Sequence, residues 1–310
     1  MGEKFVRESR PLIRKASLCA FKKISAIVLS YNTKETTIRC VKSLFAHSPM
    51  LADLQLVVVD NASEDGSADA IEKEFPEIKL IRNAANRGFA AACNQGILSS
   101  DGDLVLLLNS DTEIFDQSLD IVLDFLSKNK EIGLAGGAML GADMIPQNSC
   151  QPFPTYSNLI FSKKSLLTGL NSVRNKFREF RKVPDVVTDV DALAGGFLFI
   201  RRDVLDRIGL LDERFFFYVE DIDLAKRVWA DGWRVTYIPQ ARVIHIGGTS
   251  VASHPEKTYW WHHRSLYRYF MKYRPNLRPV NWILGLGLVL HYIIWLALRK
   301  IGVALKKGMR

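Results

Sequence analysis

Two apolar segments of the sequence end abruptly in carboxylates. Leu104–Leu108 is an unbroken apolar run followed by Asn-Ser-Asp, which ends at Asp111, and the run Leu54–Val59 is followed by Asp60. If these two segments are strands of one sheet, a nucleotide bound beyond their ends would need one carboxylate for its base or ribose and another for a divalent cation on its diphosphate. Because diphosphate oxygens are hard ligands, the expected cation is Mg²⁺ or Mn²⁺. The same residue types also favour turns and helix N-caps, so this pattern alone leaves a structural interpretation open.

A second group of candidates follows four consecutive aromatic residues, Phe215–Tyr218. Shielding from water would raise the pKa of Glu220 and Asp221 toward that of a general base, whereas the alternative is an acidic first turn of a helix. A third candidate is His245, which precedes Gly247-Gly248, where a backbone can approach a phosphate closely. A single histidine on a strand is more often a core or surface residue than a ligand, although the following Gly-Gly favours the ligand interpretation.

The elements that would position these residues alternate between strands and helices. Apolar, β-branched runs predict strands over residues 24–30, 54–59, 78–81 and 104–108. Helical patterns lie between and after them, over residues 33–47, 68–74, 90–98 and 117–128. This alternation predicts an α/β fold with a Rossmann-like, mostly parallel central sheet. Ligands bind beyond the carboxyl ends of such strands, which is where Tyr31, Asp60 and Asp111 would emerge.

The remainder of the chain divides into three parts. Residues 142–189 are richer in Pro, Asn, Ser and Lys and have weaker periodicity, which predicts an insertion on the acceptor side of the site. Strand patterns resume at 192–200, 233–238 and 242–246. We therefore predict a basic N-terminal segment over 1–23, a catalytic domain over 24–253 and C-terminal helices over 254–310.

The formal charge of +9 is concentrated at the two ends of the chain. Basic ends on an acidic body indicate a surface held against something anionic, either a membrane or a nucleic acid. Residues 282–298 carry no formal charge and lie between basic residues, which fits lipid better than nucleic acid. An in-plane or re-entrant helix fits this segment at least as well as a single span. The four scattered cysteines are typical of free thiols in a reducing compartment.

Several of these stretches, taken in order, resemble the family 2 glycosyltransferases of the GT-A fold. The similarity extends over about residues 24–275 and is carried by 26–32, 57–67, 86–91, 106–113, 195–201, 216–227 and 245–248. Within that family the sequence is most similar to bacterial rhamnosyltransferases of O-antigen, capsule and cell-wall glycan assembly. The resemblance implies an inverting transfer of a single sugar, L-rhamnose from dTDP-rhamnose, to a glycan or polyprenyl-linked acceptor. It also implies a location at the cytoplasmic face of the cell membrane.

The resemblance assigns roles to individual residues. It implies Asp221 as the general base beside Glu220, Asp111 as the metal ligand of a DXD-type motif, and His245 as a residue that completes the metal site in some members. The implied contacts to the nucleotide sugar are Tyr31, Asn32, Asp60, Asn86, Arg87, Gly88, Asn109, Ser110, Gly195 and Gly196.

The sequence departs from the family pattern at Asn109, because the first position of the DXD-type motif is normally Asp. The QxxRW motif of processive synthases is also missing, which favours one addition per encounter. Other donors of the UDP-GlcNAc, UDP-glucose or UDP-galactofuranose type, and a catalytically inactive membrane scaffold, remain alternatives. A dinucleotide-binding enzyme or a nucleotidyltransferase is disfavoured, because no Gly-rich loop follows the first strand, where Ser30-Tyr31-Asn32 stand instead.

Overall fold

The structure is a computed structural model that describes residues 20–160, 183–247 and 255–308. Most of the basic N-terminal segment predicted over 1–23, the middle of the predicted insertion and the residues from Gly248 to His254 lie outside the described residues.

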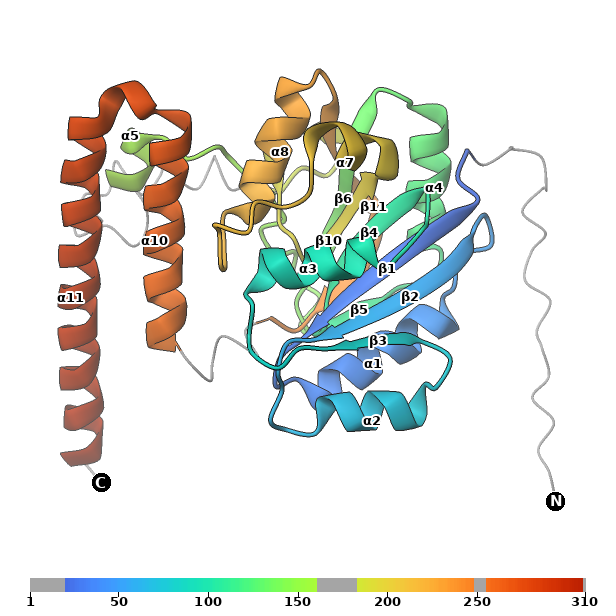
Figure 1. Cartoon of the computed structure of the whole chain (residues 1–310), viewed down its shortest axis with the longest axis horizontal. Helices are drawn as coiled ribbons and strands as arrows, with labels where there is room; N and C mark the ends of the chain where they lie inside the picture. Colours follow the sequence, from blue (N-terminus) through green and yellow to red (C-terminus); the bar gives the residue numbers. More distant parts are fainter. Residues whose placement is uncertain (1–19, 161–182, 248–254, 309–310) are drawn as a thin grey trace.

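Nine strands of the described residues form one sheet, in the order β3-β2-β1-β4-β10-β6-β11-β5, with β8 paired to β11 (Figure 1). The strands are β1 (Lys23–Ser30), β2 (Asp53–Asp60), β3 (Lys79–Arg82), β4 (Leu104–Asn109), β5 (Thr112–Ile114), β6 (Ile132–Leu140), β8 (Thr188–Asp189), β10 (Phe197–Arg201) and β11 (Arg234–His245). Strands β1 to β4 are parallel, β10 is antiparallel to both of its neighbours, and β6 is parallel to β11. The predicted mostly parallel sheet is confirmed.

The unbroken apolar run of β4 is explained by burial on both faces of the sheet. Val105 and Leu107 face one hydrophobic core, and the alternate residues Leu104, Leu106 and Leu108 face the other. All five side chains are almost completely buried. Because neither face of β4 meets solvent, the sequence carries no polar alternation there until the strand ends.

Helices cover both faces of the sheet. One face packs against α1 (Lys34–Ala46), α2 (Ser67–Glu74) and α4 (Ser118–Lys128). The other packs against α3 (Phe89–Leu98), α7 (Arg202–Ile208) and α8 (Glu220–Ala230). Two short strands, β7 (Cys150–Gln151) and β9 (Ala192–Leu193), form a separate antiparallel pair.

Three details differ from the expectation. The strand predicted over 192–200 is two strands, β9 and β10, separated at Gly195-Gly196. The two strands predicted over 233–246 are one strand, β11, with a register shift between Ile238 and Arg242. The helix-cap interpretation of Asp111 is wrong, because the residues after it form β5, which pairs with β11.

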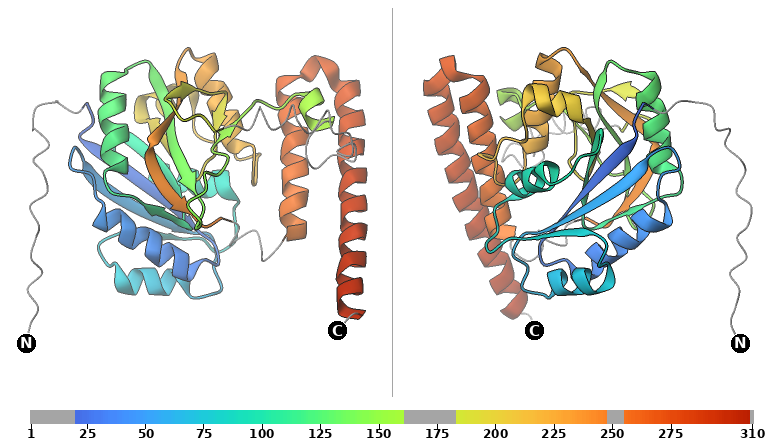
Figure 2. Two further views of the ribbon diagram at one scale, coloured as in Figure 1. Left: turned by 180° about the vertical axis from the view of Figure 1, so that it is seen from behind. Right: turned by 45° about the vertical axis from the view of Figure 1, so that its right-hand side comes forward.

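A helical hairpin lies beside the sheet domain. It consists of α10 (Pro255–Tyr273), a short 3₁₀ turn and α11 (Arg278–Gly308), and α5 (Tyr156–Ile160) packs close to it (Figures 1 and 2). The two long helices run side by side, with Tyr259 stacked on Trp295 and His263 hydrogen-bonded to His291. Helix α10 lies nearer to the sheet domain than α11, as all three views show.

Candidate active site

The register of the parallel strands brings their carboxyl ends level. Ser30 of β1 lies opposite Asp60 of β2, and Leu29 lies opposite Asn109 of β4. The residues that follow these strands therefore leave the sheet at one edge, as expected for a ligand site in an α/β fold. A cavity of about 510 Å³ opens at this edge.

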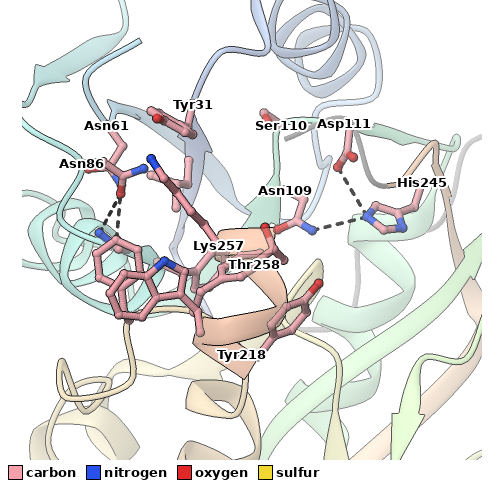
Figure 3. A pocket seen from close by; sticks show the side chains of 16 residues that line it. Tyr31, Asn61, Asn86, Asn109, Ser110, Asp111, Tyr218, His245, Lys257 and Thr258 are labelled. Atoms are coloured by element: carbon pink, nitrogen blue, oxygen red, sulfur yellow. Dashed lines mark hydrogen bonds and ion pairs between the residues drawn. The ribbon is translucent and has the colours of Figure 1, made fainter. Parts of the chain in front are cut away.

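Seven of the predicted site residues line this cavity. They are Tyr31, Asn86, Gly88, Asn109, Ser110, Asp111 and His245 (Figure 3). The other seven do not line it, and lie around or behind its wall: Asn32, Asp60, Arg87, Gly195, Gly196, Glu220 and Asp221. The structure thus separates a cavity-lining set from a supporting set.

One side of the cavity is formed by a carboxylate and an imidazole. The Nε2 atom of His245 lies 3.4 Å from Oδ1 of Asp111 and 3.3 Å from Nδ2 of Asn109 (Figure 3). The other ring nitrogen, Nδ1, lies 2.7 Å from Oε1 of Gln147. Backbone pairing fixes this arrangement, because Thr112 of β5 lies opposite His245 and the Ile246 N–H donates to the Asp111 carbonyl. Carboxylate and imidazole side by side suit a divalent cation such as Mn²⁺.

Ser110, which lies between Asn109 and Asp111, is held by hydrogen bonds to buried hydroxyl groups. The Ser110 hydroxyl lies 2.9 Å from that of Thr33, which belongs to a buried group of hydroxyls with Ser30 and Thr37. Burial of this network is tolerable because its hydroxyls are hydrogen-bonded to one another. It fixes the turn between β4 and β5, and with it the direction of Asp111.

The Asp60 carboxylate is buried and only partly satisfied. Its Oδ2 accepts a hydrogen bond from the Ser63 N–H at 3.0 Å, whereas its Oδ1 is buried and has no hydrogen-bond partner among the described residues. An unsatisfied buried carboxylate oxygen is costly, and such atoms are often completed by a ligand.

Opposite the metal candidates, Asn61 ties the β2 end to the loop before α3. Its Nδ2 donates to Oδ1 of Asn86 at 2.9 Å, and its Oδ1 accepts from the Arg87 N–H at 3.0 Å (Figure 3). Gly88 follows with φ +84°, and a Cβ there would lie 2.5 Å from the carbonyl oxygen of Phe216. Glycine is therefore required both for the left-handed backbone and for the close approach of the 216–218 segment.

Asp221 lies behind the Gly195-Gly196 break. Its Oδ2 accepts hydrogen bonds from the Gly195 N–H and from Nε2 of Gln151, both at 3.1 Å. The carbonyl of Gly196 accepts from the Asn109 N–H, so the same two glycines border Asp221 on one side and the cavity-lining Asn109 on the other. Gly195 carries no side chain, and a Cβ there would lie 3.7 Å from the Cβ of Asp221.

The electrostatics of the acidic pair follow from its burial. Burial and the neighbouring Asp221 carboxylate raise the pKa of Glu220 well above its usual range, and its Oε2 has no hydrogen-bond partner among the described residues. Burial also raises the pKa of Asp221, although hydrogen bonds from the N–H groups of Ile222 and Gly195 oppose this. Raised carboxyl pKa values are what general bases need.

The backbone before this pair is strained. Tyr218 and Val219 have φ values of +64° and +74°, in the left-handed region that β-branched residues rarely adopt. Strain of this kind is held in place by surrounding structure and concentrates at functional sites. Here it sets the direction in which Glu220 and Asp221 enter α8.

The sequence pattern did not identify part of the cavity wall. Helix α10 contributes Lys257, Thr258 and Trp261 to the lining of the cavity. Figure 3 shows Lys257 on the side formed by Tyr31, Asn61 and Asn86. Trp261 stacks on Phe216, with ring centroids 4.3 Å apart. The residue types of α10 gave no signal for this role, because its basic and aromatic residues equally fit a helix at a membrane surface.

An open, mostly parallel sheet with helices on both faces and a cavity beyond its strand ends is the architecture of the GT-A fold. The chain belongs to glycosyl transferase family 2, whose model matches residues 25–209.

Curated relatives include bacterial rhamnosyltransferases. The chain is 28% identical over 266 residues to an N-acetylglucosaminyl-diphospho-decaprenol L-rhamnosyltransferase of Mycobacterium tuberculosis, a match that covers 80% of this chain and 85% of the relative. It is also 28% identical over 177 residues to the rhamnosyltransferase WbbL of Escherichia coli K12, covering 56% of this chain and 64% of the relative.

Solved structures share the fold at lower identity. A mannosyltransferase from Pyrobaculum calidifontis, solved with GDP-Man and Mn²⁺, has a TM-score of 0.55 and 16% identity, with 92% of this chain and 79% of that chain covered. GalNAc-T7, solved with UDP, GalNAc and Mn²⁺, has a TM-score of 0.56 and 18% identity, with 73% and 44% covered.

Proposed function

We propose that this glycosyltransferase moves a single L-rhamnose from dTDP-rhamnose, with inversion, to a lipid-linked saccharide or glycan acceptor. The main support for this proposal is the cavity at the strand ends, with Asp111 and His245 on one side and Tyr31 and Asn61 facing them. Such a cavity suits a nucleoside diphosphate with its base at one end and its diphosphate at the other. The rhamnosyltransferases among the relatives support the choice of sugar, and the Mycobacterium tuberculosis relative supports a lipid diphosphate acceptor.

The residues present fit a divalent cation. Asp111 and His245 offer an oxygen and a nitrogen ligand, and the described residues hold no group of three or more His, Cys, Asp or Glu side chains that could enclose an ion by themselves. Diphosphate oxygens and water would then supply the remaining ligands, as is usual for Mg²⁺ and Mn²⁺. A cation bound there would neutralise the charge that develops on the departing diphosphate.

The remaining residues bind and orient the substrates. Tyr31 would pack on the base, and Oδ1 of Asp60 would accept a hydrogen bond from a base N–H, which would satisfy a buried atom that otherwise lacks a partner. The donor side of the cavity would be shaped by Asn86, Arg87, Gly88 and Asn32. Asn109 and Ser110 would contact the diphosphate sugar.

Asp221 would act as the general base. It would take the proton of the acceptor hydroxyl as that oxygen attacks the anomeric carbon, while Glu220 and the backbone at Gly195-Gly196 hold it in place. The raised pKa of Asp221 supports this role, because a stronger base accepts the proton more readily. Alignment of both substrates in one site supplies a further part of the rate.

The outer face of α11 would contact the cytoplasmic face of the cell membrane. The described part of the chain contains one helix long and apolar enough to span a bilayer, Pro275–Ile301, and only 6% of its most apolar window is buried. Its exposed apolar side chains include Trp282, Ile283, Leu286, Val289, Leu290, Ile293 and Leu298. Basic residues at both ends of the segment match an anionic lipid surface.

The packing of α11 favours a position in the plane of the membrane over a span. Its inner face is occupied by α10 along most of its length, through the Tyr259–Trp295 and His263–His291 contacts. A span would either break these contacts or draw the charged Arg264 of α10 into the hydrocarbon, which is costly. An in-plane helix keeps the hairpin intact and buries only the outer apolar face.

A product-release screen tests the proposal. Purified full-length protein is incubated with dTDP-rhamnose, UDP-GlcNAc, UDP-glucose or UDP-galactofuranose, together with a polyprenyl-diphosphate-GlcNAc acceptor and either Mg²⁺ or Mn²⁺. We expect release of dTDP from dTDP-rhamnose, dependent on the acceptor and abolished by EDTA. Release of UDP from one of the UDP-sugars would instead identify that sugar nucleotide as the donor. No release of a nucleoside diphosphate from any donor would support the inactive scaffold.

A further inference from the structure

Gln147 makes a two-point contact with His245, across 98 positions of the sequence. Its Oε1 lies 2.7 Å from Nδ1 of the imidazole, and its Nε2 lies 2.7 Å from the backbone carbonyl oxygen of the same residue. Gln147 falls within the segment predicted as an acceptor-side insertion, and nothing in the sequence pattern connects it with the strand that carries His245.

Chemistry alone fixes the orientation of this amide. A backbone carbonyl oxygen can only accept a hydrogen bond, so the amide group that faces it must be the NH₂ of Gln147. The amide oxygen therefore faces Nδ1 of His245. Because that oxygen can only accept, Nδ1 must carry the proton.

The opposite ring nitrogen is left with its lone pair. A neutral imidazole carries one N–H, so a proton on Nδ1 leaves Nε2 as an acceptor. The contact with Asn109 is consistent with this tautomer, because its Nδ2 lies 3.3 Å from Nε2 and is placed to donate to it. The lone pair thus lies beside Oδ1 of Asp111, 3.4 Å away, where a cation would need it.

Gln147 is itself held by backbone contacts. Its N–H donates to the Met139 carbonyl at 2.8 Å, and a short turn closed by the Gly141 N–H and the Ile145 carbonyl precedes it. A bridge between Leu140 and Pro146 completes this turn. The side chain therefore projects from the segment that returns alongside the end of β6, the strand next to β11.

We propose that Gln147 is a positioning residue that fixes the tautomer and ring orientation of His245 so that Nε2 can bind the cation. This rests on the proposed function, in which His245 is a metal ligand. Histidine ligands in proteins commonly donate their other N–H to such a partner. In the absence of a cation, the same geometry gives Asn109 a role at the position where an Asp is expected: its amide donates to the Nε2 lone pair, which a carboxylate could not do, and a cation bound at Nε2 would replace this hydrogen bond.

The first test measures the tautomer in metal-free protein. Two-dimensional ¹⁵N–¹H spectra of full-length, ¹⁵N-histidine-labelled protein distinguish a protonated Nδ1 from a protonated Nε2, and a His245→Gln variant assigns the signal. We expect His245 with its proton on Nδ1 and an unprotonated Nε2. A proton on Nε2 would overturn the proposal.

The second test measures Mn²⁺ affinity by electron paramagnetic resonance of free Mn²⁺, with dTDP and with UDP in parallel. Gln147→Leu removes both hydrogen bonds, and we expect it to weaken Mn²⁺ binding roughly 10- to 100-fold. Gln147→Glu keeps an acceptor for the Nδ1 proton and should retain most of the affinity. Gln55→Leu, a matched control at the opposite end of the sheet where Gln55 contacts Ser25, should leave it unchanged.

These readouts separate the two proposals. Wild-type affinity in Gln147→Leu, with a thermal unfolding midpoint equal to that of the parent, would refute the role of Gln147 whatever the enzyme transfers. Loss of Mn²⁺ binding in Gln147→Leu and retention in Gln147→Glu would support it even if the donor screen found no transfer.

Discussion

Three carboxylates near one sheet edge occupy three different environments, and the environment of each matches a different task. Asp111 lies at the cavity beside an imidazole. Asp60 is buried, and one of its carboxylate oxygens has no hydrogen-bond partner in the described part of the chain. Asp221 is buried among N–H donors behind two glycines. The environment of Asp111 suits binding of a cation, and that of Asp60 suits a hydrogen bond from an N–H of a bound nucleotide. The environment of Asp221 suits uptake of a proton.

The pH dependence of transfer should report Asp221. A general base must be ionised to accept a proton, so kcat/KM should fall as the pH drops through the pKa of Asp221. Because burial raises that pKa, the midpoint of the fall should lie above the ordinary aspartate value of 3.8. Initial rates at saturating Mn²⁺ across the acid range measure it, and a midpoint at or below 3.8 would contradict the assignment.

Glu220 should make the folded protein less stable as the pH rises. Its pKa is raised in the folded state, so between the ordinary glutamate value of 4.5 and that raised pKa the folded state binds more protons than the unfolded state. The free energy of unfolding must therefore decrease with increasing pH across this window. Glu220→Gln should flatten the decrease, as measured by urea denaturation at a series of pH values. Equal slopes in the two proteins would show that Glu220 does not carry the effect.

For individual residues, the sequence pattern located candidates at the strand ends. It did not reveal contact partners that are distant in the sequence. Asp111 and His245 could be singled out because each stands beside a strand end and a polar or glycine pair. Gln147 could not, because its contact with His245 depends on the adjacency of β6 and β11, which no local pattern encodes. The Asn109 departure likewise acquired a physical explanation only from the distance to Nε2 of His245.

At the scale of elements, a buried ionic group joins α10 to α8. The fully buried Asp223 accepts hydrogen bonds from Lys272 at 2.6 Å, Tyr273 at 2.7 Å and Arg227 at 2.9 Å. Lys272 also donates to Asp212 at 2.8 Å. A buried carboxylate needs such partners, so this group anchors the hairpin and, with it, the part of the cavity wall that α10 supplies.

Lys272→Met should loosen this anchor. We expect a loss of about 2 kcal/mol in the free energy of unfolding, because Asp223 would keep Arg227 and Tyr273 but lose one charged hydrogen bond. Chemical denaturation measures the loss. Lys128→Met is the control, since Lys128 pairs with Asp124 on an exposed helix surface, where ion pairs contribute little. Equal effects of the two substitutions would argue against the anchor.

Most helices and strands could be predicted from the sequence, whereas the points at which strands are interrupted could not. Apolar runs and helical periodicity located the parallel strands β1 to β4 and the helices between them. The three-residue β5 is too short to carry a pattern, and it is held by pairing with β11. The break at Gly195-Gly196 lies inside an otherwise continuous apolar run, and its purpose, contact with Asp221, is visible only in three dimensions.

At the scale of the whole molecule, the cavity and the apolar helix α11 belong to one unit. Helix α10 supplies cavity wall on one side and packs against α11 on the other. An acceptor carried by a lipid would thus reach the cavity from the surface on which α11 lies.

The outer face of α11 should bind anionic vesicles. A combined Leu286→Asp and Ile293→Asp variant places two carboxylates on side chains that are 73% and 54% exposed, and it should lose most vesicle binding in a flotation assay. Leu98→Asp, at a position 74% exposed on α3, should bind like the parent. Unchanged vesicle binding by the double variant would exclude this face as the membrane contact. If alkaline carbonate did not extract the bound parent from the vesicles, a membrane-spanning helix would be indicated.

In the proposed mechanism, Asp221 deprotonates the acceptor while other residues hold the donor. A comparison of Asp221→Asn with the parent tests this, for both transfer of L-rhamnose from dTDP-rhamnose and binding of dTDP-rhamnose with Mn²⁺. We expect transfer to be abolished while the dissociation constant stays within about threefold, because Asp221 lies behind the cavity wall and the asparagine keeps its shape. Retained transfer, or loss of donor binding in a folded protein, would contradict it.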